Sequence, residues 1–255
     1  MYLDSHAHLS SEELFPHFPD LHAKAKEAKV DAMINICTDP LSLEKGFVLK
    51  EKYSDVFLAA SSTPHDSEEE ASLFFPQVVQ AAKKGQLVAI GETGLDYHYE
   101  HAPRKQQAER MVCYFQLAIE TKLPIIFHCR EAFADLFSIA EKEYSQKPAL
   151  LHCFTGTMEE AKRVLDQGWY ISLSGIVTFA KSGALQEVAK YVPLDRMMIE
   201  TDAPYLAPRS KRGTVNEPAF IPETAEMIAK IKNISVEEVA FQTQKNARLF
   251  FSLPL

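Results

Sequence analysis

The sequence predicts a single-domain α/β protein, a (β/α)₈ TIM barrel that spans residues 1–255. Eight short apolar runs alternate with longer segments whose apolar residues recur at helical spacing, which is typical of a parallel sheet covered by helices. A length of 255 residues suits one closed barrel. No Gly/Ser-rich or Pro-rich stretch divides the chain, so we expect no linker and no second domain.

The expected strands are rich in β-branched and other apolar residues and are mostly bounded by turn or polar residues. In chain order they cover residues 1–5, 31–37, 57–61, 87–91, 124–129, 149–153, 170–174 and 196–201. An open doubly wound sheet is the alternative fold. Such a sheet should carry a Gly-rich phosphate loop after an early strand, and the sequence contains neither GxGxxG nor GxxxxGK[ST]. We therefore predict the barrel.

Helices are predicted between these strands and after the last one. Residues 103–121 have apolar positions at helical spacing, and residues 158–167 form a second such segment that stops at Gly168. Residues 222–251 read as two further helices. The second of these opens at Ser235, where Glu238 three positions later completes a capping box.

The composition is that of an ordinary globular protein, with 46% hydrophobic and 24% charged residues. The 27 basic and 35 acidic side chains give a net charge of −8, which argues against a protein that coats nucleic acid by bulk charge. Phosphate-bearing substrates can still bind if metal ions supply the positive charge. The first residues lack a basic segment followed by an apolar run, no stretch approaches the roughly 20 apolar residues of a membrane span, and the four cysteines are scattered. We expect a cytoplasmic protein with reduced thiols.

Polar side chains stand where the expected strands stop. In a parallel barrel the C-terminal ends of all strands open onto one mouth, so these side chains should converge there. A lone histidine at a strand end is more often a hydrogen-bonded residue than a ligand, but the joint placement favours a metal site. The candidate metal ligands are His6, His8, Glu92, His128, His152 and Asp202.

Six ligands exceed what one tetrahedral ion takes, so two ions that share a carboxylate are the economical arrangement. Glu92 is central in strand order and is the natural bridge. Histidine and carboxylate ligands suit Zn²⁺ or Mn²⁺, and a carboxylate-rich set also admits Mg²⁺. By strand alternation Cys129 and Cys153 should face away from the site. Asp4 and Glu200 should share its face, either to orient ligands or to make structural hydrogen bonds.

The chain resembles the TatD family of metal-dependent deoxyribonucleases, within the amidohydrolase-like barrel superfamily. The resemblance covers essentially the whole chain, and its segments occur in the family's order. They are DSHAHL (4–9), GETGLDY (91–97), HCREA (128–132), HCFTG (152–156), SGIVTF (174–179), ETDAPYLAP (200–208), NEP (216–218) and KNARLFF (245–251).

The resemblance implies a dinuclear centre and hydrolysis of phosphodiester bonds in DNA, as a 3′–5′ exonuclease in several members. It implies one ion held by His6, His8, Glu92 and Asp202, and another by Glu92, His128 and His152. Because attack by water adds negative charge to an anionic phosphodiester, two cations can activate the water and stabilise the attacking and leaving oxygens. We take Glu92 and Asp202 as catalytic, with Asp202 as the group that accepts the proton of the attacking water.

Five further substrate contacts follow from position or resemblance. Arg130 shares the face of His128 and could hold a phosphate, although an ion pair with Glu131 or Glu159 is an equal alternative. The family's His-Pro-His segment reads Thr63-Pro64-His65 here, so only His65 is carried over. The remaining contacts suggested by the resemblance are Arg212, Asn216 and Glu217.

We expect the substrate to be single-stranded DNA or strand ends, and the protein to be a monomer. One alternative is an amidohydrolase-type enzyme acting on a small cyclic amide, lactone or ester. Many of those bridge their metals with a modified lysine at the end of the fourth strand, and here that position is Glu92, which tilts the choice toward phosphoesters. The other alternative is a barrel that has lost its chemistry, which the complete ligand set disfavours.

Overall fold

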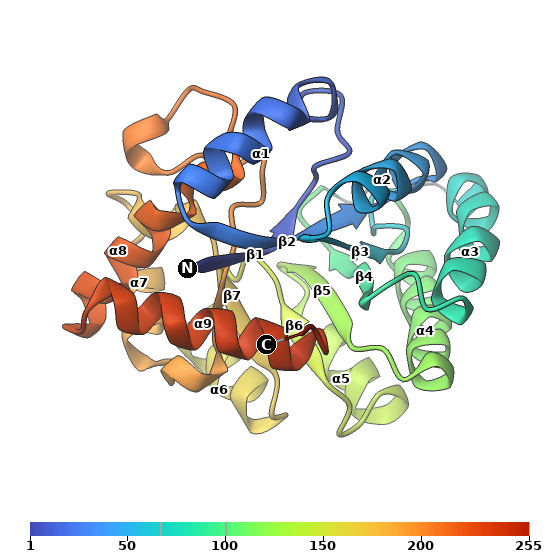
Figure 1. Cartoon of the computed structure of the whole chain (residues 1–255). Helices are drawn as coiled ribbons and strands as arrows, with labels where there is room; N and C mark the ends of the chain where they lie inside the picture. The colour runs from blue at the N-terminus through green and yellow to red at the C-terminus, as the bar shows by residue number, and fades with distance from the viewer. Residues whose placement is uncertain (67, 100, 255) are drawn as a thin grey trace.

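Eight parallel strands pair in chain order, and helices form an outer ring around them (Figure 1). The structure is a computed structural model that describes residues 1–66, 68–99 and 101–254. The strands are β1 (Tyr2–Ala7), β2 (Val30–Cys37), β3 (Val56–Ala60), β4 (Ala89–Asp96), β5 (Ile125–Arg130), β6 (Ala149–Leu151), β7 (Tyr170–Leu173) and β8 (Met197–Ile199).

In the described residues, seven α-helices follow the first seven strands in turn, and two more follow β8. Ser235 caps the last helix by accepting a hydrogen bond from the Glu238 amide, as the sequence indicates. No helix in the described part of the chain is long and apolar enough to cross a bilayer. The helices are α1 (Phe18–Glu27), α2 (Pro40–Lys52), α3 (Glu68–Lys83), α4 (Arg104–Thr121), α5 (Phe133–Glu143), α6 (Met158–Asp166), α7 (Gly183–Tyr191), α8 (Ile221–Lys232) and α9 (Val236–Phe250).

The first and last strands meet to bring the sheet round on itself. The Asp202 amide donates to the carbonyl of His6 at 2.9 Å, and the His8 amide donates to the carbonyl of Ala203 at 2.7 Å. These bonds lie at the C-terminal ends of β1 and β8. The (β/α)₈ barrel that the alternation of strands and helices predicts is therefore confirmed.

Several strands differ from their expected bounds, and β4 differs most. The sequence places its end at residue 91, whereas the strand continues to Asp96. Gly91 and Gly94 look like turn residues, but both lie inside the strand with φ of 152° and 153°. A Cβ atom at Gly94 would collide with the backbone of His128, so glycine is needed for close approach of β4 to β5.

Two apolar layers fill the structure below the mouth of the barrel. One lies between strands and helices and includes Phe115, Phe127 and Trp169. The other joins residues such as Leu3 to the end of α9 at Phe250. Polar side chains are thereby left to gather near the C-terminal ends of the strands.

A buried carboxylate strengthens the junction between β1 and β8. Asp4 accepts hydrogen bonds from the amide of Thr201 at 2.9 Å, from its hydroxyl at 2.5 Å and from the His6 amide at 3.3 Å. Burial raises the pKa of Asp4 to about 7 in spite of these bonds. Asp4 therefore holds the backbone of His6 and Thr201 in place beneath the site.

Replacing Asp4 by alanine is expected to lower the free energy of unfolding by about 3 kcal/mol, because several buried donors lose their acceptor. Urea denaturation in the presence of chelator measures this without a contribution from bound metal. The control is Asp20→Ala, on the exposed surface of α1, which should stay within about 0.5 kcal/mol of the wild type. Equal stability of the two variants would contradict the role of Asp4.

Candidate metal centre

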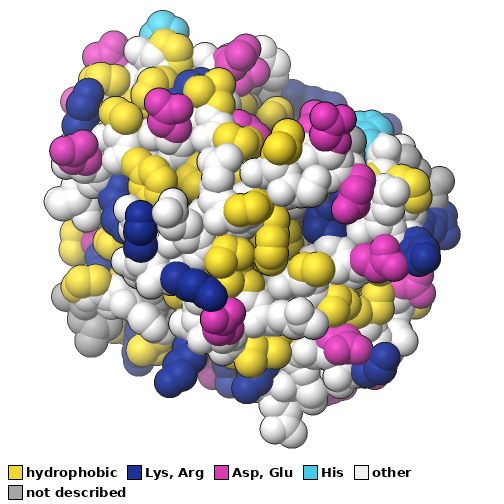
Figure 2. Space-filling model, turned by 90° about the vertical axis from the view of Figure 1, so that its right-hand side faces the viewer, with side chains coloured by type: hydrophobic (Ala, Val, Ile, Leu, Met, Phe, Trp, Pro, Cys, Tyr) yellow, Lys and Arg dark blue, Asp and Glu magenta, His cyan; other side chains and the backbone are white. Residues whose placement is uncertain are grey.

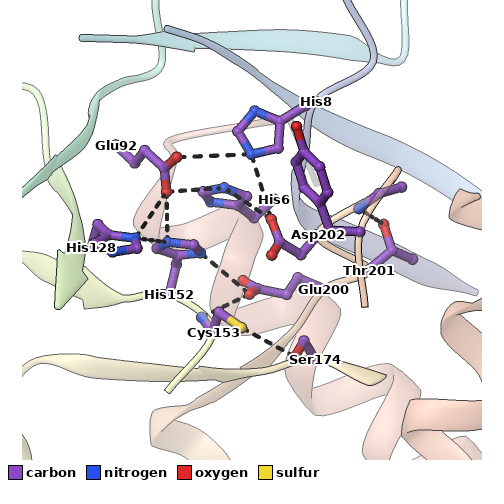
Figure 3. A network of polar contacts seen from close by, with 12 residues as sticks. His6, His8, Glu92, His128, His152, Cys153, Ser174, Glu200, Thr201 and Asp202 are labelled. Carbon is purple, nitrogen blue, oxygen red and sulfur yellow. Dashed lines mark hydrogen bonds and ion pairs between the residues drawn. The ribbon is translucent and has the colours of Figure 1, made fainter. Parts of the chain in front are cut away.

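The six predicted ligands converge at the mouth of the barrel, as Figure 3 shows. His6 lies in β1 and His8 directly follows that strand, so alternation turns both rings to the same side. Glu92 lies within β4 and His128 within β5. The other two ligands, His152 and Asp202, follow β6 and β8.

Glu92 and Asp202 lie between the two histidines of the first strand. The Nε2 atom of His6 is 3.5 Å from Oε2 of Glu92 and 3.7 Å from Oδ1 of Asp202. The Nε2 atom of His8 is 3.8 Å from Oε1 of Glu92 and 3.5 Å from Oδ1 of Asp202. Two imidazoles thus face the same pair of carboxylates.

The other two histidines approach Glu92 from the opposite side. The Nε2 atom of His152 is 2.6 Å from Oε2 of Glu92, and Nδ1 of His128 is 3.7 Å from the same oxygen. The facing nitrogens of His128 and His152 are 3.3 Å apart. Glu92 is therefore the one carboxylate that faces all four imidazoles of the set.

Burial and neighbouring charges prepare His6 and Glu92 to bind a cation. Burial, reinforced by the charge of His152, holds the pKa of His6 well below its usual value, so its ring keeps a free lone pair. Burial alone would raise the pKa of Glu92, but His152, His128 and His6 hold it well below its usual value. A neutral imidazole and an ionised carboxylate are the forms that ligate metal.

Unpaired polar atoms show that this donor set fits metal ions. Within the described residues, neither ring nitrogen of the buried His6 takes part in a hydrogen bond. Buried polar atoms without partners are rare, and a cation satisfies such lone pairs. Two groups able to hold an ion share Glu92: His6, His8 and Glu92, and then Glu92, His128 and His152. Glu92 is common to both groups, and its role as a bridge between two ions stays a prediction.

Comparison with known proteins identifies the family. The family model described as TatD related DNase matches residues 3–252. The chain belongs to the TatD family. Several relatives in this family are described as metal-dependent hydrolases, and the residue groups described above are the chain's candidate metal ligands.

The TatD relatives match over nearly their whole length. YcfH of Escherichia coli K12, an uncharacterized metal-dependent hydrolase, is 39% identical over 97% of this chain and 95% of its own. YabD of Bacillus subtilis, of the same description, is 34% identical over 99% and 100%. The 3′-5′ ssDNA/RNA exonuclease TatD of Erwinia tasmaniensis is 35% identical over 90% and 92%. Among solved structures, the TatD homologue YJJV of E. coli K12 has a TM-score of 0.93 at 23% identity, over 99% and 98% of the two chains, which supports the fold.

Glu200, in the ETDAPYL segment of the TatD motifs, stands behind His152. Its Oε1 atom accepts the amide of Cys153 at 2.7 Å and lies 3.5 Å from Nδ1 of His152. Burial would lower the pKa of His152, but Glu92 and Glu200 raise it well above its usual value. Of the two carboxylates expected to lie behind the ligands, Glu200 is therefore the one beside an imidazole.

Cys153 does not face away from the site, contrary to the expectation from alternation. Its Sγ atom is 3.3 Å from Oγ of Ser174, and it joins the network of Figure 3. Strand β6 ends at Leu151, and Cys153 has a φ of 42°, so strand alternation does not extend to it. Cys129, which lies inside β5, packs against the apolar core as expected.

Two of the expected TatD substrate contacts lie beside the metal groups or on the adjoining rim. The ring of His65 is 5.3 Å from that of His128. Arg130 is half-buried, with its guanidinium 4.7 Å from the centre of the Tyr99 ring. The acidic residues weighed as partners of Arg130 pair elsewhere, Glu131 with His98 at 2.8 Å and Glu159 with Lys162 at 2.6 Å. Arg130 is therefore stacked on an aromatic ring instead of paired with either acid.

The other three expected contacts lie in the loop after β8. Arg212 is exposed, and its guanidinium is 5.4 Å from the centre of the Phe179 ring. The Nδ2 atom of Asn216 donates to the carbonyls of Thr201 at 2.7 Å and Tyr205 at 2.6 Å, so this buried amide holds the loop in place. Glu217 pairs with a lysine of α1 at 3.1 Å. Contacts of these residues with substrate stay predictions.

One buried carboxylate of the GETGLDY segment was not predicted as part of the site. Asp96 lies 2.9 Å from Nε2 of His128, on the side of the ring away from Glu92. Because the expected strand stops at residue 91, no face could be assigned to Asp96. Extending the strand would have revealed it, since Glu92 and Asp96 are four positions apart and alternation places them on the same face.

Proposed function

We propose that this protein is a deoxyribonuclease that hydrolyses phosphodiester bonds of DNA, as a 3′–5′ exonuclease on single strands or strand ends. The observation that carries the proposal is a shared carboxylate, Glu92, between two sets of imidazoles, with the guanidinium of Arg130 on the adjoining rim. The TatD relative from Erwinia tasmaniensis, named as a 3′-5′ ssDNA/RNA exonuclease, supports this choice of substrate.

Two divalent ions, Mg²⁺, Mn²⁺ or Zn²⁺, complete the proposed site. His6, His8, Glu92 and Asp202 would hold one, and Glu92, His128 and His152 would hold the other. Such ions supply positive charge that activates water and offsets the charge of the reacting phosphate. The chain's own ligands keep the lone pairs needed for this, because His6 is buried and Glu92 stays ionised.

Asp202 is the proposed proton acceptor. Its Oδ1 atom faces the Nε2 atoms of His8 and His6 at 3.5 Å and 3.7 Å. A carboxylate in this position can take the proton of an attacking water molecule while it still faces the ligand set. The backbone amide of Asp202 donates a hydrogen bond to the carbonyl of His6, which fixes the backbone that carries the carboxylate.

Recognition of the DNA backbone is expected to be local. The net charge is −8, and on the face shown in Figure 2 lysine and arginine side chains are interspersed with aspartate and glutamate. A surface of this kind does not attract a polyanion along its whole length. The proposed substrate is therefore held by a few contacts at the mouth, with Arg130 as the phosphate ligand.

Replacing Arg130 by glutamine is expected to raise the KM for single-stranded DNA about tenfold, because one charge-assisted hydrogen bond to phosphate is lost. The salt dependence of DNA binding should also weaken by about 0.7 in its logarithmic slope. The matched control is Arg163→Gln, since Arg163 pairs with Glu141 on α5 and should leave both quantities unchanged. A tenfold loss of kcat at constant KM would instead contradict a binding role.

Product analysis tests the proposed function directly. Single- and double-stranded DNA labelled at either end is incubated with the protein and a series of divalent metals, with chelator as the control. Release of mononucleotides from the 3′ end of single strands, abolished by chelator, is the expected result. Metal-dependent hydrolysis of lactones or cyclic amides with intact DNA would replace the proposal by the amidohydrolase alternative. The monomeric state and cytoplasmic location stay predictions.

A further inference from the structure

We propose that Asp96 is a positioning residue that fixes the ring of His128 so that its Nδ1 atom is presented to the second metal ion. The inference rests on the proposed two-ion site. It assigns a role to a residue outside the ligand set, and it extends that role to Gln107, a side chain of helix α4 that holds Asp96 in place.

The two carboxylate oxygens of Asp96 contact different partners. Oδ1 accepts hydrogen bonds from the amides of His98 and Tyr99, both at 2.9 Å. Oδ2 lies 2.9 Å from Nε2 of His128 and 3.6 Å from Nε2 of His65. The first oxygen therefore anchors the carboxylate to the loop after β4, and the second is directed at two imidazoles of the site.

Gln107 fixes the backbone of Asp96 from the first turn of α4. Its Oε1 atom accepts the Asp96 amide at 2.8 Å. Its Nε2 atom donates to the carbonyl of Asp96 at 3.1 Å and to that of Ala102 at 2.8 Å. Asp96 and Gln107 are both buried, at 0% and 1% exposure, so water does not compete for these bonds. The carboxylate is thus rigid on its backbone as well as on its side chain.

This geometry selects one form of the neutral imidazole. A carboxylate only accepts hydrogen bonds, so its contact with Nε2 of His128 requires the proton on that nitrogen. The lone pair is then on Nδ1, which faces Glu92 Oε2 at 3.7 Å and His152 Nε2 at 3.3 Å. A metal-ligating histidine commonly gives its other N–H to a carboxylate in this way, which orients the ring and strengthens the ligand.

A third cation between His65, Asp96 and His128 is the competing interpretation, since their ligand atoms lie within 4.8 Å of one another. That cation would bind Nε2 of His128 while the second ion binds Nδ1. A neutral imidazole has a lone pair on only one nitrogen, so both bonds would require removal of its remaining proton. The chemistry of the ring therefore favours the positioning role.

The first test is calorimetric titration of the metal-free protein and of Asp96→Asn with Zn²⁺. The asparagine keeps an oxygen for the amides of His98 and Tyr99 but turns an NH₂ group toward His128, which favours the wrong ring form. We expect two ions in the wild type, with affinity for one of them reduced by about 10- to 100-fold in the variant. The control is Asp135→Asn, an exposed carboxylate that accepts the hydroxyl of Tyr97, and it should bind both ions normally.

Unchanged affinities in a folded Asp96→Asn would overturn the proposal, and so would three ions in the wild type with two in the variant. A second measurement needs only the wild type. Nitrogen NMR of the zinc-loaded protein with labelled histidine should show the proton of His128 on Nε2, and a proton on Nδ1 would overturn the proposal even if the variant does not fold. Neither readout uses DNA, so a failure of the proposed nuclease activity in the product assay is distinguished from a failure here.

Discussion

Replacing Glu92 by glutamine is expected to abolish hydrolysis and to weaken the binding of both ions by more than about 100-fold. Loss of a supporting residue behind a ligand already costs about 10- to 100-fold in metal affinity, and Glu92 is the carboxylate that both ligand groups share. The amide also directs N–H groups at nitrogens that should offer lone pairs, such as Nε2 of His152 at 2.6 Å. Activity should fall by more than about 10³-fold, the upper cost of losing a single electrostatic contact to the transition state.

Calorimetry with Mn²⁺ and turnover of end-labelled single-stranded DNA measure the two effects. The matched control is Glu131→Gln, an exposed glutamate whose carboxylate pairs with His98 and lies outside the ligand groups. It should bind both ions and retain activity. Two ions bound by Glu92→Gln at the wild-type affinity would show that Glu92 does not bridge them.

Replacing Asp202 by asparagine is expected to lower kcat by about 10²- to 10⁴-fold, the usual contribution of a general base. The amide retains an oxygen that can face the first ion, and His6, His8 and Glu92 still form a ligand group without it. Metal should therefore remain bound in large part while turnover is lost. Because the proton is taken only as the reaction proceeds, kcat and kcat/KM should fall together.

Single-turnover kinetics at saturating Mn²⁺ separate this loss from a loss of metal. The control is Asp195→Asn, an exposed residue before β8 that should leave kcat unchanged. Near-native kcat in Asp202→Asn would mean that another group accepts the proton. A loss that excess Mn²⁺ restores would make Asp202 a ligand and not a base.

The strand order and the convergence of the ligands could be predicted because each depends on local pattern. His6 and His8 are two positions apart after an apolar run, and alternation alone places them on one face. The common direction of the strands then brings the distant ligands to one mouth. Neither step requires knowledge of how side chains pack.

The features that the sequence did not predict depend on contacts between elements that are distant along the chain, or on the local backbone conformation. Gly94 resembles a stop, yet it lies inside β4 because a side chain there would collide with the backbone of His128. The positive φ of Cys153 turns its thiol toward Ser174, where alternation predicted the opposite face. The hydrogen bonds of Gln107 to Asp96 join a helix to a strand, and the spacing of the two residues along the sequence does not predict them.

The hydrogen bond between the Asp202 amide and the His6 carbonyl also determines when the site can form during protein synthesis. His6 and His8 in the region of β1 are translated long before Asp202, which follows β8. A nascent chain that stalls before β8 lacks Asp202, the proposed proton acceptor, and the backbone hydrogen bonds that hold His6 and His8. The proposed metal centre can therefore form only after β8 and Asp202 have been translated.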